Sequence, residues 1–103
     1  MADKRLKAAA TYSGVSDKDM NTFMVNLLAA MSPNNVGGYM IAAEGNTWIE
    51  IEGDEDDVND VCTFIDNDGI FATFTVESVV TITSRKLTKN YLYYENKTPV
   101  TSL

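Results

Sequence analysis

The fold is decided by the stretch Gly37–Asp57, which reads GGYMIAAEGNTWIEIEGDEDD. Its first part, Tyr39–Ala43, is short and apolar, as expected for a buried strand. Glu44-Gly45-Asn46 has the composition of a hairpin turn, and Thr47–Glu52 then alternates like a second strand. The stretch therefore predicts a β-hairpin around which the rest of the chain is organised. The alternation separates two faces, with Trp48, Glu50 and Glu52 on one and Thr47, Ile49 and Ile51 on the other.

Before the hairpin, the sequence predicts one strand and one helix. Leu6–Tyr12 is interpreted as a strand because Ser13-Gly14 separates it from the helix that follows, although its three alanines favour helix by propensity. Ser16 is expected to cap the start of that helix, and Pro33 to end it. Between them, apolar residues recur at helical spacing and predict a face packed against a sheet: Met20, Phe23, Met24, Leu27, Leu28 and Met31.

After the hairpin, the sequence predicts a second helix and two strands. The acidic run Asp54–Asp57 suits the first turn of a helix, where the helix dipole favours negative charge. Ile70–Thr83 is rich in β-branched and aromatic residues, and Tyr91–Tyr94 has a similar character, so both are expected to be strands. The inward stripe of the second helix is expected at Val58, Val61, Cys62 and Ile65.

The expected element order is strand, helix, strand, strand, helix, strand, strand. This order predicts an α+β fold of the ferredoxin-like type, βαββαβ, with an added C-terminal strand. Two helices would cover one face of the sheet and leave the other face open. Residues 1–95 are expected to form a single domain, and residues 96–103 a C-terminal tail.

Composition limits the classes of function. The 103-residue chain has 45% hydrophobic and 22% charged residues, as in one globular domain, and its net charge of −7 argues against binding to nucleic acid or anionic membranes. It has no histidine, the commonest general base and metal ligand, and its one cysteine rules out an internal disulfide. No secretory signal or membrane-spanning run is recognisable, so a cytoplasmic protein without a metal is expected.

The hairpin stretch and its flanks resemble the BLUF domain, a flavin-binding blue-light sensor with a ferredoxin-like fold. Ile51-Glu52-Gly53 stands where the family closes its third strand with Leu-Glu-Gly, and Ile82–Arg85 resembles the stretch before the family's last strand. The resemblance runs from about Tyr12 to Arg85. The other residues that carry it are Gly38, Tyr39, Met40, Ile41, Gly45, Trp48, Val58, Val61, Ile65 and Asp68.

The resemblance also implies where a flavin would be contacted. The family's strand tyrosine falls on Tyr12 or Thr11, its helix asparagine near Met31, and its glutamine on Ile49. Methionine and isoleucine cannot make the hydrogen bonds of an amide. We therefore expect no cofactor, with FAD or FMN as the alternative.

Three functions follow as hypotheses. The preferred one is a non-catalytic BLUF-like module that forms a homodimer or docks a protein partner through the open sheet face. Its expected aromatic anchors are Trp48, Tyr91, Tyr93 and Tyr94. The alternatives are a flavin-binding blue-light sensor with an atypical site, and an enzyme that uses Glu50 and Glu52, because carboxylates two residues apart on a strand point the same way.

Overall fold

The computed structural model describes residues 2–95. It contains β1 (Asp3–Thr11), α1 (Asp17–Met31), a short 3₁₀ turn η1 (Ser32–Asn34), β2 (Gly37–Ala43), β3 (Asn46–Asp54), α2 (Glu55–Asp68), β4 (Thr73–Ile82) and β5 (Asn90–Tyr94). The predicted order of helices and strands is confirmed. The tail predicted at residues 96–103 lies outside the described residues.

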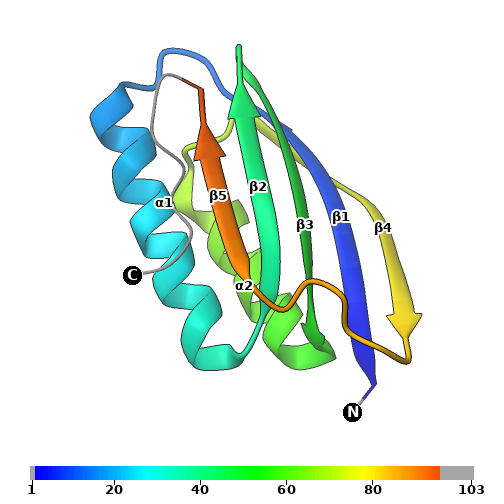
Figure 1. Cartoon of the computed structure of the whole chain (residues 1–103). Helices are drawn as coiled ribbons and strands as arrows, with labels where there is room; N and C mark the ends of the chain where they lie inside the picture. The colour runs from blue at the N-terminus through cyan, green and yellow to red at the C-terminus, as the bar shows by residue number, and fades with distance from the viewer. Residues whose placement is uncertain (1, 96–103) are drawn as a thin grey trace.

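The five strands form one sheet in the order β4-β1-β3-β2-β5. All neighbouring pairs are antiparallel except β2 and β5, which are parallel. The segment between β4 and β5 therefore crosses the end of the sheet from one edge to the other, while α1 and α2 lie against one face (Figure 1). The α+β, ferredoxin-like prediction with an added strand is confirmed.

The β2–β3 hairpin closes through a tight turn at Glu44 and Gly45. Both residues have positive φ, 54° and 85°, which is the geometry that two-residue hairpins require. Both strands extend beyond their predicted ends, because Gly37 and Gly38 of β2 pair with β3, and Gly53 and Asp54 of β3 pair with β1. The register places Trp48 opposite Ile41 and Glu50 opposite Tyr39, so these four side chains share the open face.

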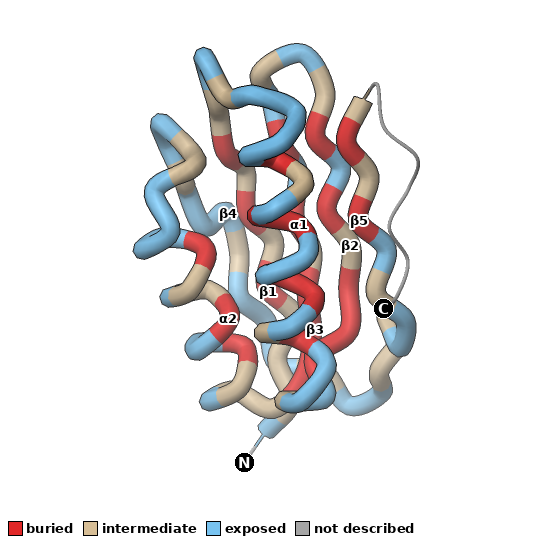
Figure 2. Tube along the Cα trace, turned by 90° about the vertical axis from the view of Figure 1, so that its left-hand side faces the viewer, coloured by how far each residue is buried: buried red, intermediate tan, exposed pale blue. Residues whose placement is uncertain are grey.

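Both helices begin at a residue whose side chain accepts a hydrogen bond from the first turn. The Ser16 hydroxyl accepts a hydrogen bond from the Asp19 backbone N–H at 3.1 Å, which confirms the predicted cap. Asp54 caps α2, and Gly69 ends it with φ 83°. The buried positions of both helices face the sheet (Figure 2), and neither helix of the described chain has the length and apolar character needed to cross a lipid bilayer.

Other strand boundaries also differ from the prediction, most clearly at the starts of β1 and β4. Strand β1 begins at Asp3 rather than Leu6, because its charged first residues find partners on distant segments, such as Arg85 for Asp3. Strand β4 begins at Thr73 rather than Ile70. The Phe71 side chain instead packs edge-on against Phe23 of α1, with ring centroids 5.2 Å apart.

Candidate functional site

Aromatic side chains fill the layer between the helices and one end of the sheet. Phe23 of α1 stacks with Phe64 of α2 at 5.9 Å between ring centroids, with the ring planes nearly parallel. Tyr12, which follows β1, lies 6.5 Å from Phe71 and 6.2 Å from Tyr94. These rings form one apolar cluster that joins both helices to the ends of β1 and β5.

A hollow of about 260 Å³ opens beside this cluster, between the start of α1 and the end of α2. Phe23 lines it, and Gly69 and Ile70 close the far side. The polar side chains at its rim are Asp19, Thr22 and Asn26 of α1 and Asp68 of α2. A planar ring entering here would meet an aromatic surface and a polar rim.

None of the three predicted flavin contacts lines this hollow, and two of them are apolar. Met31 and Ile49 have no exposed surface and belong to the hydrophobic core. Tyr12 is half-buried and packs against that core from its edge. Two of the three predicted flavin-contact positions are therefore occupied by apolar side chains that pack within the core.

Thr47 is a site residue that the sequence reasoning did not single out. It lies on the helix-facing side of β3, is 5% exposed, and pairs across the sheet with Ala10 and Ala42. Its Oγ1 is the only buried side-chain polar atom without a hydrogen-bond partner among residues 2–95. Burying an unpaired hydroxyl costs about 1–3 kcal/mol, so a bound polar group that pairs with Thr47 would remove this cost. A threonine on the otherwise apolar face shared with Ile49 and Ile51 was the available signal.

Glu52 occupies the opposite face at the other end of β3 and is completely buried. Its Oε2 accepts hydrogen bonds from Arg5, whose Nε and Nη2 both lie at 2.8 Å, and its Oε1 accepts from the backbone N–H groups of Lys86 and Leu87. Burial alone would raise the pKa of Glu52, but the hydrogen bonds from Leu87, Lys86 and Arg5 hold its pKa below the ordinary value.

Glu52 therefore anchors the segment that crosses from β4 to β5. Arg85 supports the same segment, since its side chain pairs with Asp3 at 2.9 Å and donates to the Asn35 carbonyl. Glu50 has different partners, Tyr39 at 2.6 Å and Lys7 at 3.9 Å. The two glutamates share neither a proton nor a cation, and no group of three metal-ligating side chains occurs within the described chain.

Comparison with known proteins gives fold neighbours only among solved structures, since neither a protein-family model nor a curated protein matches this sequence. A bacterial light-regulated adenylyl cyclase has 18% identity and a TM-score of 0.82, with 93% of this chain and 29% of that chain covered. BlrB, a BLUF protein in its dark state, has 12% identity and a TM-score of 0.82 over 92% of this chain and 74% of its own. The chain has a BLUF-domain fold.

A third neighbour concerns the cofactor. BlrP1 of Klebsiella pneumoniae, solved with FMN and cyclic diGMP, has 11% identity and a TM-score of 0.74, with 91% of this chain and 25% of that chain covered. The expectation that this chain has no cofactor was wrong in the light of these BLUF neighbours. Its own residues fit a flavin in part. The structure has an aromatic cluster and, at Thr47, a buried hydroxyl without a partner among residues 2–95, but no amide side chain at position 31 or 49.

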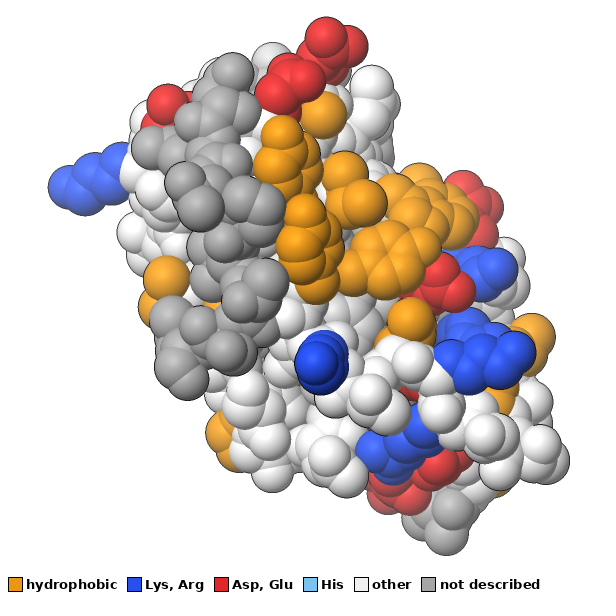
Figure 3. Space-filling model, in the orientation of Figure 1, with side chains coloured by type: hydrophobic (Ala, Val, Ile, Leu, Met, Phe, Trp, Pro, Cys, Tyr) orange, Lys and Arg blue, Asp and Glu red, His pale blue; other side chains and the backbone are white. Residues whose placement is uncertain are grey.

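The open face of this BLUF fold carries a group of exposed apolar side chains over β5, β2 and β3 (Figure 3). Register places Tyr91 beside Tyr39, and Tyr93 beside Ile41. Trp48, 37% exposed, donates from its indole N–H to the Tyr39 hydroxyl at 3.2 Å, and Tyr39 donates to Glu50. Burial, followed by the hydrogen bond to Glu50, raises the pKa of Tyr39.

Tyr94 does not belong to this open face, which corrects its place among the predicted anchors. It alternates with Tyr93, is 8% exposed, and faces the helices. Its hydroxyl donates to Asp17 of α1 at 2.9 Å, and this hydrogen bond, together with burial, raises the pKa of Tyr94. Tyr94 therefore ties β5 to the start of α1.

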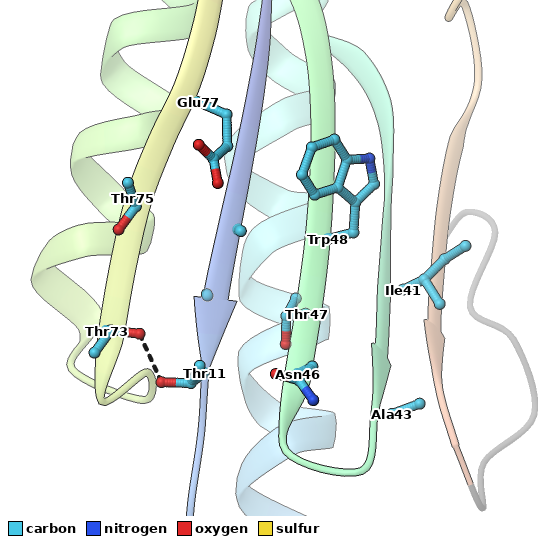
Figure 4. Close-up of a pocket in the computed structure, with 11 residues that line it drawn as sticks. Thr11, Ile41, Ala43, Asn46, Thr47, Trp48, Thr73, Thr75 and Glu77 are labelled. Atoms are coloured by element: carbon cyan, nitrogen blue, oxygen red, sulfur yellow. Dashed lines mark hydrogen bonds between the residues drawn. The ribbon is translucent and has the colours of Figure 1, made fainter.

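A groove of about 500 Å³ runs along the open face over β1. Thr73, Thr75 and Glu77 of β4 line one side, and Trp48 with Ile41 lines the other (Figure 4). Ala9 lies between Trp48 and Thr75 in register, so a small side chain forms the floor. The predicted anchor Trp48 thus borders both the groove and the apolar group.

Proposed function

We propose that this chain is a BLUF-type flavin-binding module with an atypical site between the helices and the sheet. The observation that carries the proposal is the buried Thr47 hydroxyl on the helix-facing side of β3, which has no hydrogen-bond partner within residues 2–95. The aromatic cluster of Phe23, Phe64 and Phe71 supports it, since an isoalloxazine ring is planar and largely apolar. The flavin-bound BlrP1 neighbour, which shares the fold, supplies the class of ligand.

In this site the chain's own residues would hold the ring and supply one polar contact. Thr47 can both donate and accept a hydrogen bond, so it can meet either kind of atom at the ring's polar edge. Tyr12 and Phe23 would provide aromatic walls, and Asn26 a polar group at the rim of the hollow. A bound flavin would supply visible absorption and redox chemistry.

Riboflavin uptake tests this proposal, because riboflavin carries the ring without a phosphate. The wild-type chain is expected to retain it in equilibrium dialysis, and Thr47→Val to bind about fivefold to tenfold more weakly after losing one hydrogen bond. Without riboflavin, Thr47→Val should unfold at a higher temperature than wild type, because an unpaired buried hydroxyl has been removed.

Thr75→Val is the matched control, since Thr75 is exposed on the opposite face. It should leave riboflavin binding unchanged. Wild-type protein that takes up no riboflavin, or Thr47→Val that binds it equally well, would contradict the proposed site. Because Ile49 has no amide group, we expect blue light to cause no shift in the absorption of the bound flavin of the kind that requires a glutamine side chain at this position.

A second proposal concerns how such a module would act on another molecule. The open face displays Ile41, Trp48 and Tyr91 with 43%, 37% and 39% of their surfaces exposed. Large aromatic side chains dominate the binding energy of many interfaces. We infer that two copies associate through this face, with Trp48, Tyr91 and Tyr93 as anchors.

The association state checks this second proposal. Wild-type protein at micromolar concentration should have the mass of a dimer by light scattering, and Trp48→Ala combined with Tyr91→Ala should shift it to a monomer. Val25→Ser is the control, because Val25 is 42% exposed on α1, on the other side of the molecule. A wild-type monomer, or a double variant that remains dimeric, would refute it.

A further inference from the structure

A second hollow, of about 350 Å³, lies on the open face where the crossing segment meets β2 and β5. Gly38 and Tyr39 line it from β2, Tyr91 from β5, and Lys86, Thr88 and Lys89 from the segment. Its size is at the lower end of small-molecule sites, which range from about 300 to 1,000 Å³. It lies on the opposite side of the sheet from the proposed flavin site.

The walls of this hollow are held in place from both sides. Glu52 binds the backbone N–H groups of Lys86 and Leu87, and the Gly38 N–H donates to the Lys89 carbonyl at 3.2 Å. A Cβ on Gly37 would lie 1.8 Å from the Leu87 carbonyl oxygen, so the segment packs directly on the β2 backbone. The hollow is therefore preformed by the fold.

Two lysines line this hollow, although the net charge of the chain is −7. Every charged side chain on α1 and α2 is acidic except Lys18. The other described cations lie on β1 or in the crossing segment, and the net charge of the chain is −7. Within residues 2–95, the ammonium groups of Lys86 and Lys89 have no carboxylate partner, whereas Arg5 and Arg85 are paired. Two unpaired ammonium groups at one hollow favour an anionic ligand.

The hollow also presents aromatic surface. Tyr39 and Tyr91 are direct neighbours on the parallel strands β2 and β5. The Tyr39 ring is oriented by its hydrogen bonds to Glu50 and Trp48, and Tyr91 remains 39% exposed. Tyrosine rings stack readily on planar heterocycles.

We propose that this hollow binds a mononucleotide, with its phosphate at Lys86, Lys89 and the Thr88 hydroxyl and its base against Tyr39 and Tyr91. The charge of the two lysines selects a phosphate ester over a neutral ring, and the tyrosines select a planar base over inorganic phosphate. This site is independent of the flavin proposed between the helices and the sheet, but it shares Tyr91 with the proposed dimer contact, so AMP and a second copy of the chain would compete for this part of the open face.

Titration with AMP, followed by amide chemical shifts, tests the site. AMP is expected to shift the resonances of Gly38, Tyr91 and residues 86–89, and to bind at least about tenfold more tightly than either adenosine or inorganic phosphate. Lys86→Glu combined with Lys89→Glu should weaken AMP binding at least about tenfold. Tyr91→Ser should weaken binding of AMP but not of phosphate. Added salt should weaken AMP binding in the wild type.

Lys18→Glu is the control, because it reverses one lysine charge on α1, half of the charge change in the double variant, and should leave AMP affinity nearly unchanged. Equal weakening in Lys18→Glu, shifts located elsewhere, or no AMP binding at millimolar concentration would overturn the proposal. The double lysine variant should still take up riboflavin, and Thr47→Val should still bind AMP. Failure of one proposed site is therefore distinguishable from failure of the other.

Discussion

Glu52→Gln is expected to destabilise the protein by about 3 kcal/mol, as is typical when one partner of a buried charged cluster is removed. The neutral amide would turn its NH₂ group either toward Arg5 or toward the N–H groups of Lys86 and Leu87. Donors would then face donors at the anchor of the crossing segment. Urea-induced unfolding of the variant and the wild type measures the difference.

The dependence of stability on pH provides a second measure of how much Glu52 stabilises the fold. Because the folded-state pKa of Glu52 lies below its ordinary value of 4.5, its stabilising effect is complete above about pH 4.5 and is lost as pH falls through the folded pKa. The stability difference between wild type and Glu52→Gln should therefore narrow in acid. Glu77→Gln is the control, since Glu77 is exposed on β4, and should change stability by less than about 0.5 kcal/mol. An equal loss in both variants would show that Glu52 is no anchor.

Gly38→Ala is expected to have a comparable or larger effect, more than about 3 kcal/mol, which can prevent folding altogether. Gly38 has a φ of 154°, and a Cβ there would lie 2.1 Å from the Glu50 carbonyl oxygen and 2.7 Å from the Ile51 Cα. Both obstacles are backbone atoms of the paired strand, so no side-chain rotation relieves the overlap. The yield of soluble protein and its thermal unfolding temperature report the result.

Gly14→Ala separates backbone strain from steric overlap. Gly14 also has positive φ, 68°, but no atom lies within 4 Å of the position of its missing Cβ. Its substitution should cost only about 1 kcal/mol, the strain of a left-handed alanine. If Gly38→Ala unfolds no more easily than Gly14→Ala, the strands tolerate separation at Gly38 and the close packing is not essential.

The elements with local signals were predictable from the sequence. The Ser16 cap, the six-residue apolar stripe of α1, and the Glu44-Gly45 turn each depend on neighbours within one or two turns of chain. The exact start of β1 was not predictable, because Asp3, Lys4 and Arg5 are poor strand formers on their own. Their partners, Arg85, Thr81 and Glu52, are distant in sequence.

Among the site residues, too, some positions were predictable from the sequence and others were not. Alternation along β3 placed Trp48 and Ile49 on opposite faces, and the structure confirms this separation. Alternation also grouped Glu50 with Glu52, but it did not indicate that Glu50 is half-buried whereas Glu52 is completely buried. Along β5, both Tyr93 and Tyr94 were predicted to be anchors on the open face, although adjacent residues of a strand point to opposite faces, and the structure shows that Tyr94 faces the helices.

By itself, the sequence determined the order of elements, the hairpin and the two faces of β3, because these depend on periodicity and turn chemistry over short distances. Only the tertiary structure decided that Glu52 is an anchor, that Tyr94 is a core residue, and that the Thr47 hydroxyl is buried without a partner in the part of the chain that the structure describes. Each of these depends on which strands become neighbours and on where the segment after β4 crosses the sheet. Such contacts join residues far apart in the chain, and no local pattern specifies them.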